Sequence, residues 1–178
     1  MRIIAGIYKG KKLKDFKGEE IRPTSDRAKE ALFSILSTKI LNCNFLDLCS
    51  GSGAMGIESY SRGASAVTFV DKSPKSLALT KENALSVNLT GEFVLSDAEN
   101  FILKTKSKFD VIFYDPPYAY TNVESVLQAI KRAKILNDEG VFIYERQVST
   151  EPKAVDGFEL YSSRKYGIAV FDFYKETL

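Results

Sequence analysis

The residues best suited to chemistry form a short turn after a buried apolar segment. Asp115-Pro116-Pro117-Tyr118 directly follows residues 109–114, which we expect to form a buried strand. Proline contributes no backbone N–H, so the turn offers a carboxylate and carbonyl groups as acceptors. A planar amine matches them, because Asp115 can accept from one N–H and the Pro116 carbonyl from the other. The pattern therefore indicates amine activation, since two acceptors draw the nitrogen towards a tetrahedral shape and stabilise its developing positive charge.

The rest of the residue inventory is consistent with methyl transfer to such an amine. Tyr118 can stack on the face of a nucleic-acid base. The chain has no histidine, which excludes His-based triads and general bases and argues against a zinc site. A thioether leaving a sulfonium needs no acid, so orientation and electrostatics are sufficient. The alternative is a rigid surface turn, because Asp-Pro is common turn chemistry.

A glycine-rich turn is the second candidate site. The run Gly51–Gly56 matches G-x-G-x-x-G between a predicted strand and a predicted helix, which is the context that the pattern requires. Asp71 ends the next predicted strand, twenty residues after Gly51, where a carboxylate can accept both hydroxyls of a ribose. These residues predict a nucleoside-containing cofactor, either NAD or S-adenosylmethionine. The alternative is a set of glycines that only turn the chain.

Asp47 favours one of the two cofactors. It lies inside the strand before the glycine turn, and a carboxylate there would repel a pyrophosphate. S-adenosylmethionine has no phosphate, and its ammonium group and cationic sulfur suit a nearby acid. Asp97, at the end of another predicted strand, can accept from the adenine amino group or cap the helix that begins at Ala98. Both roles of Asp97 can hold at once.

The elements that position these residues alternate between strand and helix from Asn44 onward. We expect strands at 45–48, 66–70, 93–95, 109–114 and 141–144, and helices at 54–61, 73–87, 98–104 and 123–133. The tail 159–174 is predicted to be two strands joined at Tyr166-Gly167. We therefore predict an α/β, Rossmann-like methyltransferase fold: a mostly parallel seven-stranded sheet, helices on both faces and a C-terminal antiparallel hairpin. Such sheets bind ligands outside the carboxyl ends of their strands, where the candidate residues lie.

The N-terminal part of the chain is basic. Residues 1–40 carry ten Lys or Arg against five Asp or Glu, and the remainder is mildly acidic. We predict a small basic hairpin extension at 1–22 ahead of a methyltransferase domain at 23–178. The charge indicates a polyanionic partner, but lysines also protect sheet edges, and charge alone does not separate the two.

A helix is expected to begin after Arg22-Pro23, capped by Thr24 or Ser25. Its predicted apolar face contains Ala28, Leu32, Ile35, Leu36 and Ile40.

The composition indicates one soluble globular domain. The 178 residues are 44% hydrophobic and 27% charged, which is ordinary for such domains. The apolar runs are far shorter than a bilayer requires, and the start of the chain does not resemble a secretory signal. We therefore expect a cytoplasmic protein.

Several motifs together resemble a known family. The runs 47–56 and 115–118 with Asp71 resemble the Rossmann-like amino-methyltransferases. The leading Ile3-Ile-Ala-Gly, the block Ile21-Arg-Pro-Thr-Ser-Asp-Arg-Ala-Lys-Glu-Ala-Leu-Phe and Ser61-Arg-Gly-Ala narrow the likeness. They resemble the RsmD family, the bacterial small-subunit (16S) ribosomal RNA guanine-N2 methyltransferases. The likeness covers nearly the whole chain, from residue 2 to the hairpin at Lys165-Tyr-Gly.

The resemblance implies a reaction, a partner and roles for residues. S-adenosyl-L-methionine would methylate the N2 amine of a guanine in small-subunit ribosomal RNA, within an assembled or nearly assembled subunit. The methionine end of the cofactor would contact Asp47, Gly51 and Gly53, its ribose Asp71 and its adenine Asp97. The full set of expected cofactor residues is Asp47, Ser50, Gly51, Ser52, Gly53, Asp71, Lys72, Ser73, Asp97 and Ala98. The expected catalytic residues are Asp115, Pro116, Pro117 and Tyr118. The expected RNA contacts are Lys9, Lys11, Lys12, Arg22, Thr24 and Arg27.

The chain departs from the family pattern in two places. Cys49-Ser50 stands where an aromatic residue and alanine are frequent. Lys9, Lys11 and Lys12 replace frequent arginines, which keeps phosphate attraction but loses bidentate geometry.

Three rival interpretations remain. An NAD-dependent oxidoreductase would leave Asp47 and the Asp115 turn unexplained. An adenine-N6 methyltransferase of DNA or RNA would share that turn, although a DNA enzyme usually needs a further domain to recognise its target sequence. A non-catalytic RNA-binding subunit conflicts with an intact Asp-Pro-Pro-Tyr turn.

Overall fold

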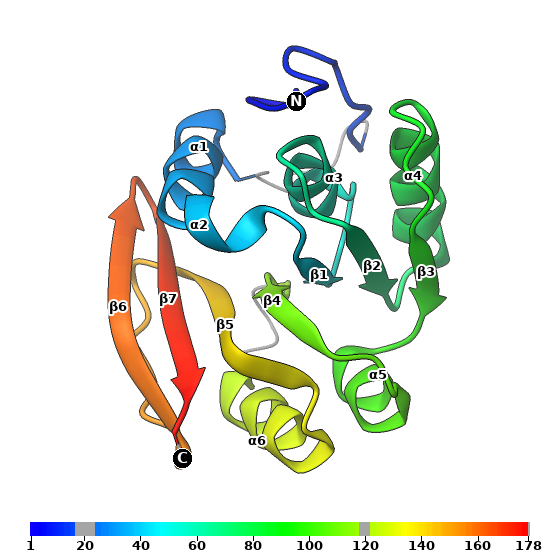
Figure 1. The fold of residues 1–178 in the computed structure, drawn as a ribbon. Helices are drawn as coiled ribbons and strands as arrows, with labels where there is room; N and C mark the ends of the chain where they lie inside the picture. The colour runs from blue at the N-terminus through cyan, green and yellow to red at the C-terminus, as the bar shows by residue number, and fades with distance from the viewer. Residues whose placement is uncertain (17–23, 118–121, 178) are drawn as a thin grey trace.

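The computed structural model describes residues 1–16, 24–117 and 122–177. Its strands form a seven-stranded sheet in the order β3-β2-β1-β4-β5-β7-β6 (Figure 1). The strands are β1 Asn44–Leu48, β2 Ala66–Asp71, β3 Glu92–Leu95, β4 Phe109–Tyr114, β5 Leu136–Gln147, β6 Phe158–Tyr166 and β7 Ala169–Glu176. Strands β1 to β5 pair in parallel, and β7 runs antiparallel to both β5 and β6. The predicted Rossmann-like sheet with its closing antiparallel hairpin is confirmed.

Helices cover both faces of the sheet. They are α1 Asp26–Ile35, α2 Ser37–Ile40, α3 Ala54–Ser61, α4 Pro74–Leu85, α5 Ala98–Lys104 and α6 Val123–Ala133. Helices α1 to α4 lie above the sheet in Figure 1, and α5 and α6 lie below it. A separate apolar core fills each side of the sheet. Successive residues of a strand point to opposite faces, so Phe113 enters one core and Ile112 enters the other. Among the described residues, no helix combines the length and apolarity needed to cross a membrane.

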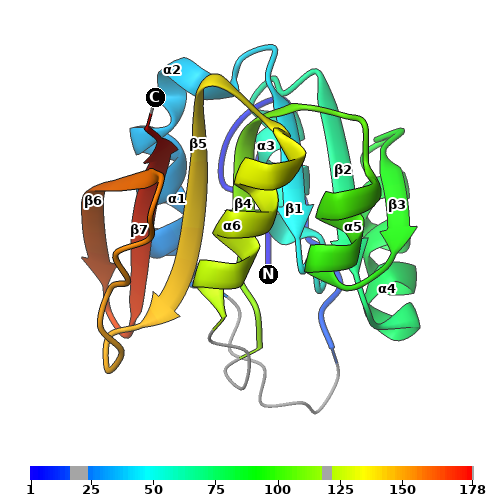
Figure 2. The ribbon, with the colours of Figure 1, turned by 90° about the horizontal axis from the view of Figure 1, so that it is seen from below.

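The carboxyl ends of the parallel strands meet at one edge of the sheet. In Figure 2 the arrowheads of β3 and β5 both point towards the lower edge. The strand order reverses between β1 and β4, the two central neighbours. A crevice outside such a reversal is where open α/β sheets bind ligands, and both candidate turns follow these two strands.

The element boundaries agree closely with the periodicity of the sequence. Helices α3, α5 and α6 match their predicted bounds, whereas β5 begins five residues earlier than expected. Ser25 caps α1, with its hydroxyl accepting from Ala28 N at 3.1 Å. One prediction on the α1 face was wrong: Ile35 is 45% exposed, and Phe33 is buried instead.

The N-terminal segment, residues 1–14, is a loop packed on α3 and α4. A single antiparallel bridge joins Arg2 and Lys12. The side chains of Ile3 and Leu13 enter the core shared with α1 and α3. Both carboxylate oxygens of buried Glu58 accept backbone N–H groups of the segment, from Ile4 at 2.9 Å and from the next residue at 3.0 Å. The division into an extension at 1–22 and a domain at 23–178 stays a prediction, and 17–22 lie outside the described residues.

Candidate active site

The glycine turn after β1 needs its glycines for different reasons. Cys49, Gly51 and Gly53 have φ of 80°, 55° and 80°, a region in which side chains are strained. A Cβ on Gly53 would lie 2.8 Å from Thr80 Cγ2, whereas a Cβ on Gly51 would meet nothing within 4 Å. Gly53 therefore permits close packing on α4, and the backbone at Gly51 borders open space. The open space at Gly51 allows close approach by a ligand.

The serines of the turn connect it to neighbouring elements. The hydroxyl of Ser50 is buried and lies 3.1 Å from that of Thr80. The carbonyl of Ser52 accepts from Asn83 Nδ2 at 2.9 Å, and its hydroxyl contacts Met1 Sδ at 3.6 Å. These predicted cofactor residues thus fix the turn in place, and direct contacts between their side chains and a cofactor stay a prediction.

Asp71 at the end of β2 also holds the turn. Its Oδ2 accepts from Gly51 N at 2.9 Å, and its Oδ1 accepts from Ser73 N at 2.8 Å. Each carboxylate oxygen has a further lone pair, so these bonds orient Asp71 without exhausting it. Ser73 caps α4 by accepting from Ser76 N. Lys72, between Asp71 and Ser73, is exposed.

Asp47 is a buried acid beneath the glycine turn. It is 1% exposed, and its Oδ2 accepts from Gly56 N at 2.9 Å. Burial raises the pKa of Asp47 to about 7, and the nearby Asp71 adds to the rise, against the lowering by the bond from Gly56. A buried carboxylate without a cation prefers its neutral form. A cation placed close to Asp47 would stabilise its ionised form.

Asp97 is exposed and caps α5. It accepts from Asn100 N at 3.0 Å, and bonds from Asn100 lower the pKa of Asp97. The capping prediction is confirmed, while adenine binding by Asp97 and the half-buried Ala98 stays a prediction.

Asp115 directly follows β4. Because β4 pairs with β1, Asp115 lies beside the glycine turn that follows β1. Its side chain is half-buried, and the following Pro116 is buried. Burial, together with the charges of Glu145 and Asp47, holds the pKa of Asp115 well above its usual range. Pro117 is exposed, and Tyr118 lies outside the described residues.

A cavity of about 410 Å³ opens beside Asp115. Its walls come from the residues before α1, from β5 and from the turn between β6 and β7. The lining residues are Thr24, Ser25, Asp115, Glu145, Arg146, Gln147, Tyr166, Gly167, Ile168 and Ala169. The structure thus brings Thr24 to the Asp115 turn, although Arg22 lies outside the described residues.

Sequence reasoning missed Glu145. Thr24 Oγ1 donates to its Oε2 at 2.7 Å, and burial raises the pKa of Glu145 to about 7. Glu145 follows the apolar run 141–144 directly, as Asp71 and Asp115 follow theirs. The rule that identified those acids, a carboxylate at the carboxyl end of a parallel strand, could have identified Glu145.

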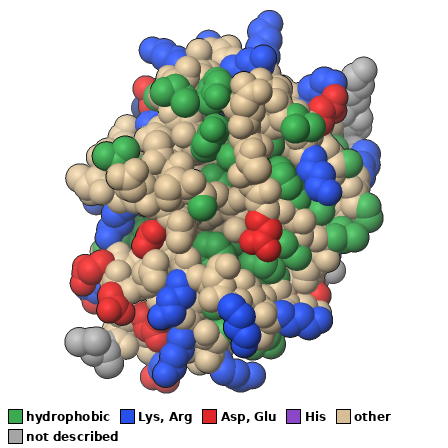
Figure 3. All heavy atoms as spheres, turned by 45° about the vertical axis from the view of Figure 1, so that its right-hand side comes forward, with side chains coloured by type: hydrophobic (Ala, Val, Ile, Leu, Met, Phe, Trp, Pro, Cys, Tyr) green, Lys and Arg blue, Asp and Glu red, His purple; other side chains and the backbone are tan. Residues whose placement is uncertain are grey.

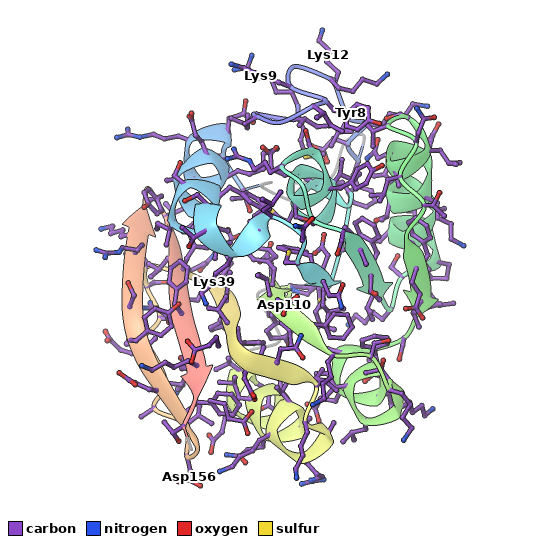
Figure 4. The ribbon with its side chains drawn as sticks, in the orientation of Figure 1. Tyr8, Lys9, Lys12, Lys39, Asp110 and Asp156 are labelled. Atoms are coloured by element: carbon purple, nitrogen blue, oxygen red, sulfur yellow. The ribbon has the colours of Figure 1, made fainter. Side chains whose placement is uncertain are left out.

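The predicted RNA-contacting lysines lie away from this cavity. Lys9, Lys11 and Lys12 are exposed on the N-terminal segment. Ile7 N donates to the carbonyl of Ser61, the last residue of α3, and Tyr8 N donates to its hydroxyl. The loop tip therefore lies at the opposite end of α3 from the glycine turn. Lys9 and Lys12 extend from the top of the molecule in Figure 4.

The surface view agrees with this placement. Lys and Arg side chains gather at the top and along the lower edge of the face in Figure 3. Arg27 is exposed on α1.

Comparison with known proteins identifies the family. A family described as conserved hypothetical protein 95 matches residues 1–175. A Bacillus subtilis protein described as a candidate rRNA methyltransferase, YlbH, is 32% identical over 182 residues, covering 99% of each chain. Ribosomal RNA small subunit methyltransferase D of Escherichia coli K12 is 29% identical, covering 98% of this chain and 89% of its own. The chain belongs to the RsmD family.

The solved structures agree with this assignment. A candidate methyltransferase from Escherichia coli, YhhF, superposes on the RsmD-family chain with a TM-score of 0.88. It is 25% identical and covers 100% of this chain and 98% of its own. The methyltransferase class and the family predicted from the motifs are both confirmed.

Proposed function

We propose that this RsmD-family protein transfers a methyl group from S-adenosylmethionine to the exocyclic N2 amine of a guanine in small-subunit ribosomal RNA. One observation carries the proposal. Asp115 lies at the end of β4, beside the glycine turn that ends β1, at the point where the strand order reverses. A methyl donor on one turn and an amine on the other would therefore be neighbours.

The acids at the carboxyl edge suit this cofactor. Asp47 is buried below the turn, Asp71 ends β2, and Asp97 follows the end of β3 as the cap of α5. This is an unfavourable surface for a pyrophosphate, but a favourable one for a ligand with an ammonium and a sulfonium. Asp47 would hold the methionine end, Asp71 the ribose and Asp97 the adenine. When bound, the cofactor supplies an electrophilic methyl group whose thioether leaves without proton transfer.

The chain's own contribution to the reaction is acceptor placement. Asp115 would accept one N–H of the amine, and the Pro116 carbonyl would accept the other. The positive charge that develops on nitrogen would then face a carboxylate in a half-buried site, where electrostatic stabilisation is larger than in water. The proton lost from the amine would pass by way of Asp115 to solvent, since burial and the neighbouring acids raise the pKa of Asp115 and make its carboxylate a stronger proton acceptor.

Ribosomal RNA as substrate is supported by the names of the relatives. The Escherichia coli and Haemophilus influenzae relatives are both named ribosomal RNA small subunit methyltransferase D. Guanine N2 as the target atom, and an assembled or nearly assembled subunit as the substrate form, follow from the family resemblance.

Methylation in vitro tests the proposal. Small ribosomal subunits from a strain lacking this gene are incubated with the protein and labelled S-adenosylmethionine, and the digested nucleosides are separated by mass spectrometry. Label should appear as N2-methylguanosine. Label in N6-methyladenosine would reassign the target, and tight binding of NADH with no binding of S-adenosylhomocysteine would instead favour an oxidoreductase.

A further inference from the structure

The cavity beside Asp115 contains a second carboxylate. Tyr114 of β4 pairs with Tyr144 of β5, and the next residues along the two strands are Asp115 and Glu145. Neighbouring strands lie about 4.8 Å apart, so these two acids stand side by side. Both line the same cavity of about 410 Å³. The arrowhead of β5 lies at the lower edge of Figure 2.

One hydrogen bond orients Glu145. Thr24 Oγ1 donates to Oε2 at 2.7 Å, and Thr24 is itself fixed next to Ser25, the cap of α1. Within the described part of the chain, no hydrogen bond reaches the other oxygen, Oε1. Burial raises the pKa of Glu145 to about 7, so its ionised form would be stabilised by another donor. Glu145 Oε1 is thus an oriented acceptor that can bind a donor group of a ligand.

An acceptor in this position can distinguish one base from another. Each exocyclic amine has ring neighbours of a particular kind. The amines of adenine and cytosine lie beside a ring nitrogen that carries a lone pair. The N2 amine of guanine lies between N3, which also carries a lone pair, and N1, which carries a hydrogen. A second acceptor next to the amine-binding acceptor therefore matches guanine and repels the other two bases.

We propose that Glu145 selects guanine by accepting the N1–H of the target base on Oε1, while Asp115 and the Pro116 carbonyl accept the two hydrogens of N2. This inference rests on the proposed function and assigns its base specificity to one residue. Thr24 is the positioning residue for Glu145.

The remaining walls of the cavity suit the faces of a base. Tyr166 ends β6 and Ile168 lies in the turn that follows it, and both line the cavity. Ile168 is 47% exposed, and its carbonyl accepts from Val148 N at 2.8 Å. That bond holds the turn against the end of β5. Base pockets commonly combine such apolar or aromatic walls with hydrogen bonds to the Watson–Crick edge.

An analogue of guanine separates recognition of N1–H from recognition of the amine. The base 2-aminopurine keeps the 2-amine but has a lone pair at N1. The methylated position is first mapped with the wild-type protein. Small-subunit RNA carrying either guanine or 2-aminopurine at that position is then assembled into subunits, and methylation rates are compared at pH 8, above the pKa of Glu145. The variants are Glu145→Gln, Thr24→Val and, as a matched control on the exposed end of β7, Glu176→Gln.

The wild type should methylate guanine faster than 2-aminopurine by about tenfold or more, because a site built for a donor rejects an analogue that lacks it. Glu145→Gln should slow guanine methylation by about tenfold or more and 2-aminopurine methylation by no more than about twofold. Thr24→Val should shift the ratio in the same direction by a smaller factor, and Glu176→Gln should leave it unchanged.

Two results would overturn the inference. If Glu145→Gln slows both substrates equally, or neither, Glu145 does not sense N1–H, although wild-type activity on guanine would leave the proposed function standing. If the wild type modifies neither base at its 2-amine, the proposed function fails, and the inference fails with it.

Discussion

Individual carboxylates at the carboxyl edge of the sheet are held in environments that oppose their charge. Burial raises the pKa of Asp47, Asp115 and Glu145, and charge repulsion adds to the rise for Asp47 and Asp115. A raised pKa in the folded state means that the stability contribution is complete below the unfolded pKa and is lost as pH rises through the folded value. The fold therefore tolerates these acids at a cost near and above pH 7. A cationic cofactor and a base rich in donors would offset that cost.

Asp115→Asn tests the role of the charge beside the amine. An amide keeps one acceptor but loses the negative charge, so methyl transfer should fall by about a hundredfold or more. The affinity for S-adenosylhomocysteine should change little. Single-turnover kinetics and calorimetry measure the two quantities, and full activity of the variant would remove the charge of Asp115 from the account.

Asp47 should make cofactor binding depend on pH. The cationic cofactor favours the ionised carboxylate, so the proton on Asp47 must leave on binding. Affinity for S-adenosylmethionine should therefore rise from pH 6 to pH 8, by up to about tenfold per unit below the pKa of about 7. Asp47→Asn should flatten this dependence in calorimetric titrations. Equal slopes in the wild type and the variant would show that another group titrates.

At the scale of elements, local residue patterns predicted the positions of strands, helices and turns, but not the contacts between distant segments. The period of apolar residues located every strand of the parallel sheet, and Gly51–Gly56 located the first turn. The bond from Thr24 to Glu145 spans 121 residues, and no local pattern encodes it. The attachment of the N-terminal segment to Glu58 was likewise beyond prediction, because a buried acid in α3 has no signature in a single sequence. Ile35 was misplaced because the buried face of α1 contains Ala28, Lys29, Leu32 and Phe33, and Ile35 lies outside it.

Two glycines of the N-terminal segment provide a matched test of its attachment. Gly6 and Gly10 have φ of 87° and 85°, so alanine at either costs about 1–2 kcal/mol of backbone strain. A Cβ on Gly6 would lie 1.8 Å from Ser61 O, whereas a Cβ on Gly10 would meet nothing within 4 Å. Gly6→Ala should therefore reduce the free energy of unfolding by about 2 kcal/mol more than Gly10→Ala, measured in urea. Equal losses would mean that the segment is not fixed on α3.

At the scale of the whole molecule, five carboxylates gather at one edge of the sheet. The carboxyl edge is acidic, with Asp47, Asp71, Asp97, Asp115 and Glu145 gathered there. These carboxylates suit the proposed cationic cofactor and are unfavourable for phosphate groups. If the protein binds RNA, its phosphate contacts must come from other surfaces, and the exposed lysines of the N-terminal segment are suitably charged.

Replacing Lys9, Lys11 and Lys12 together with alanine tests this arrangement. Binding to small ribosomal subunits should weaken, and the slope of log affinity against log salt should shrink by roughly two to three units. Affinity for S-adenosylhomocysteine and the melting temperature should barely change, because exposed lysines contribute little to folding. An unchanged slope would instead identify these lysines as protection of an exposed edge.

The central claim, methylation of guanine N2 in small-subunit ribosomal RNA, is tested most directly in cells. Nucleosides from purified small-subunit RNA are quantified by mass spectrometry in a strain lacking this gene. The RNA should lose N2-methylguanosine while its N6-methyladenosine stays constant. The wild-type gene should restore the loss, and the Asp115→Asn gene should not. An unchanged N2-methylguanosine content in the deletion strain would contradict the account.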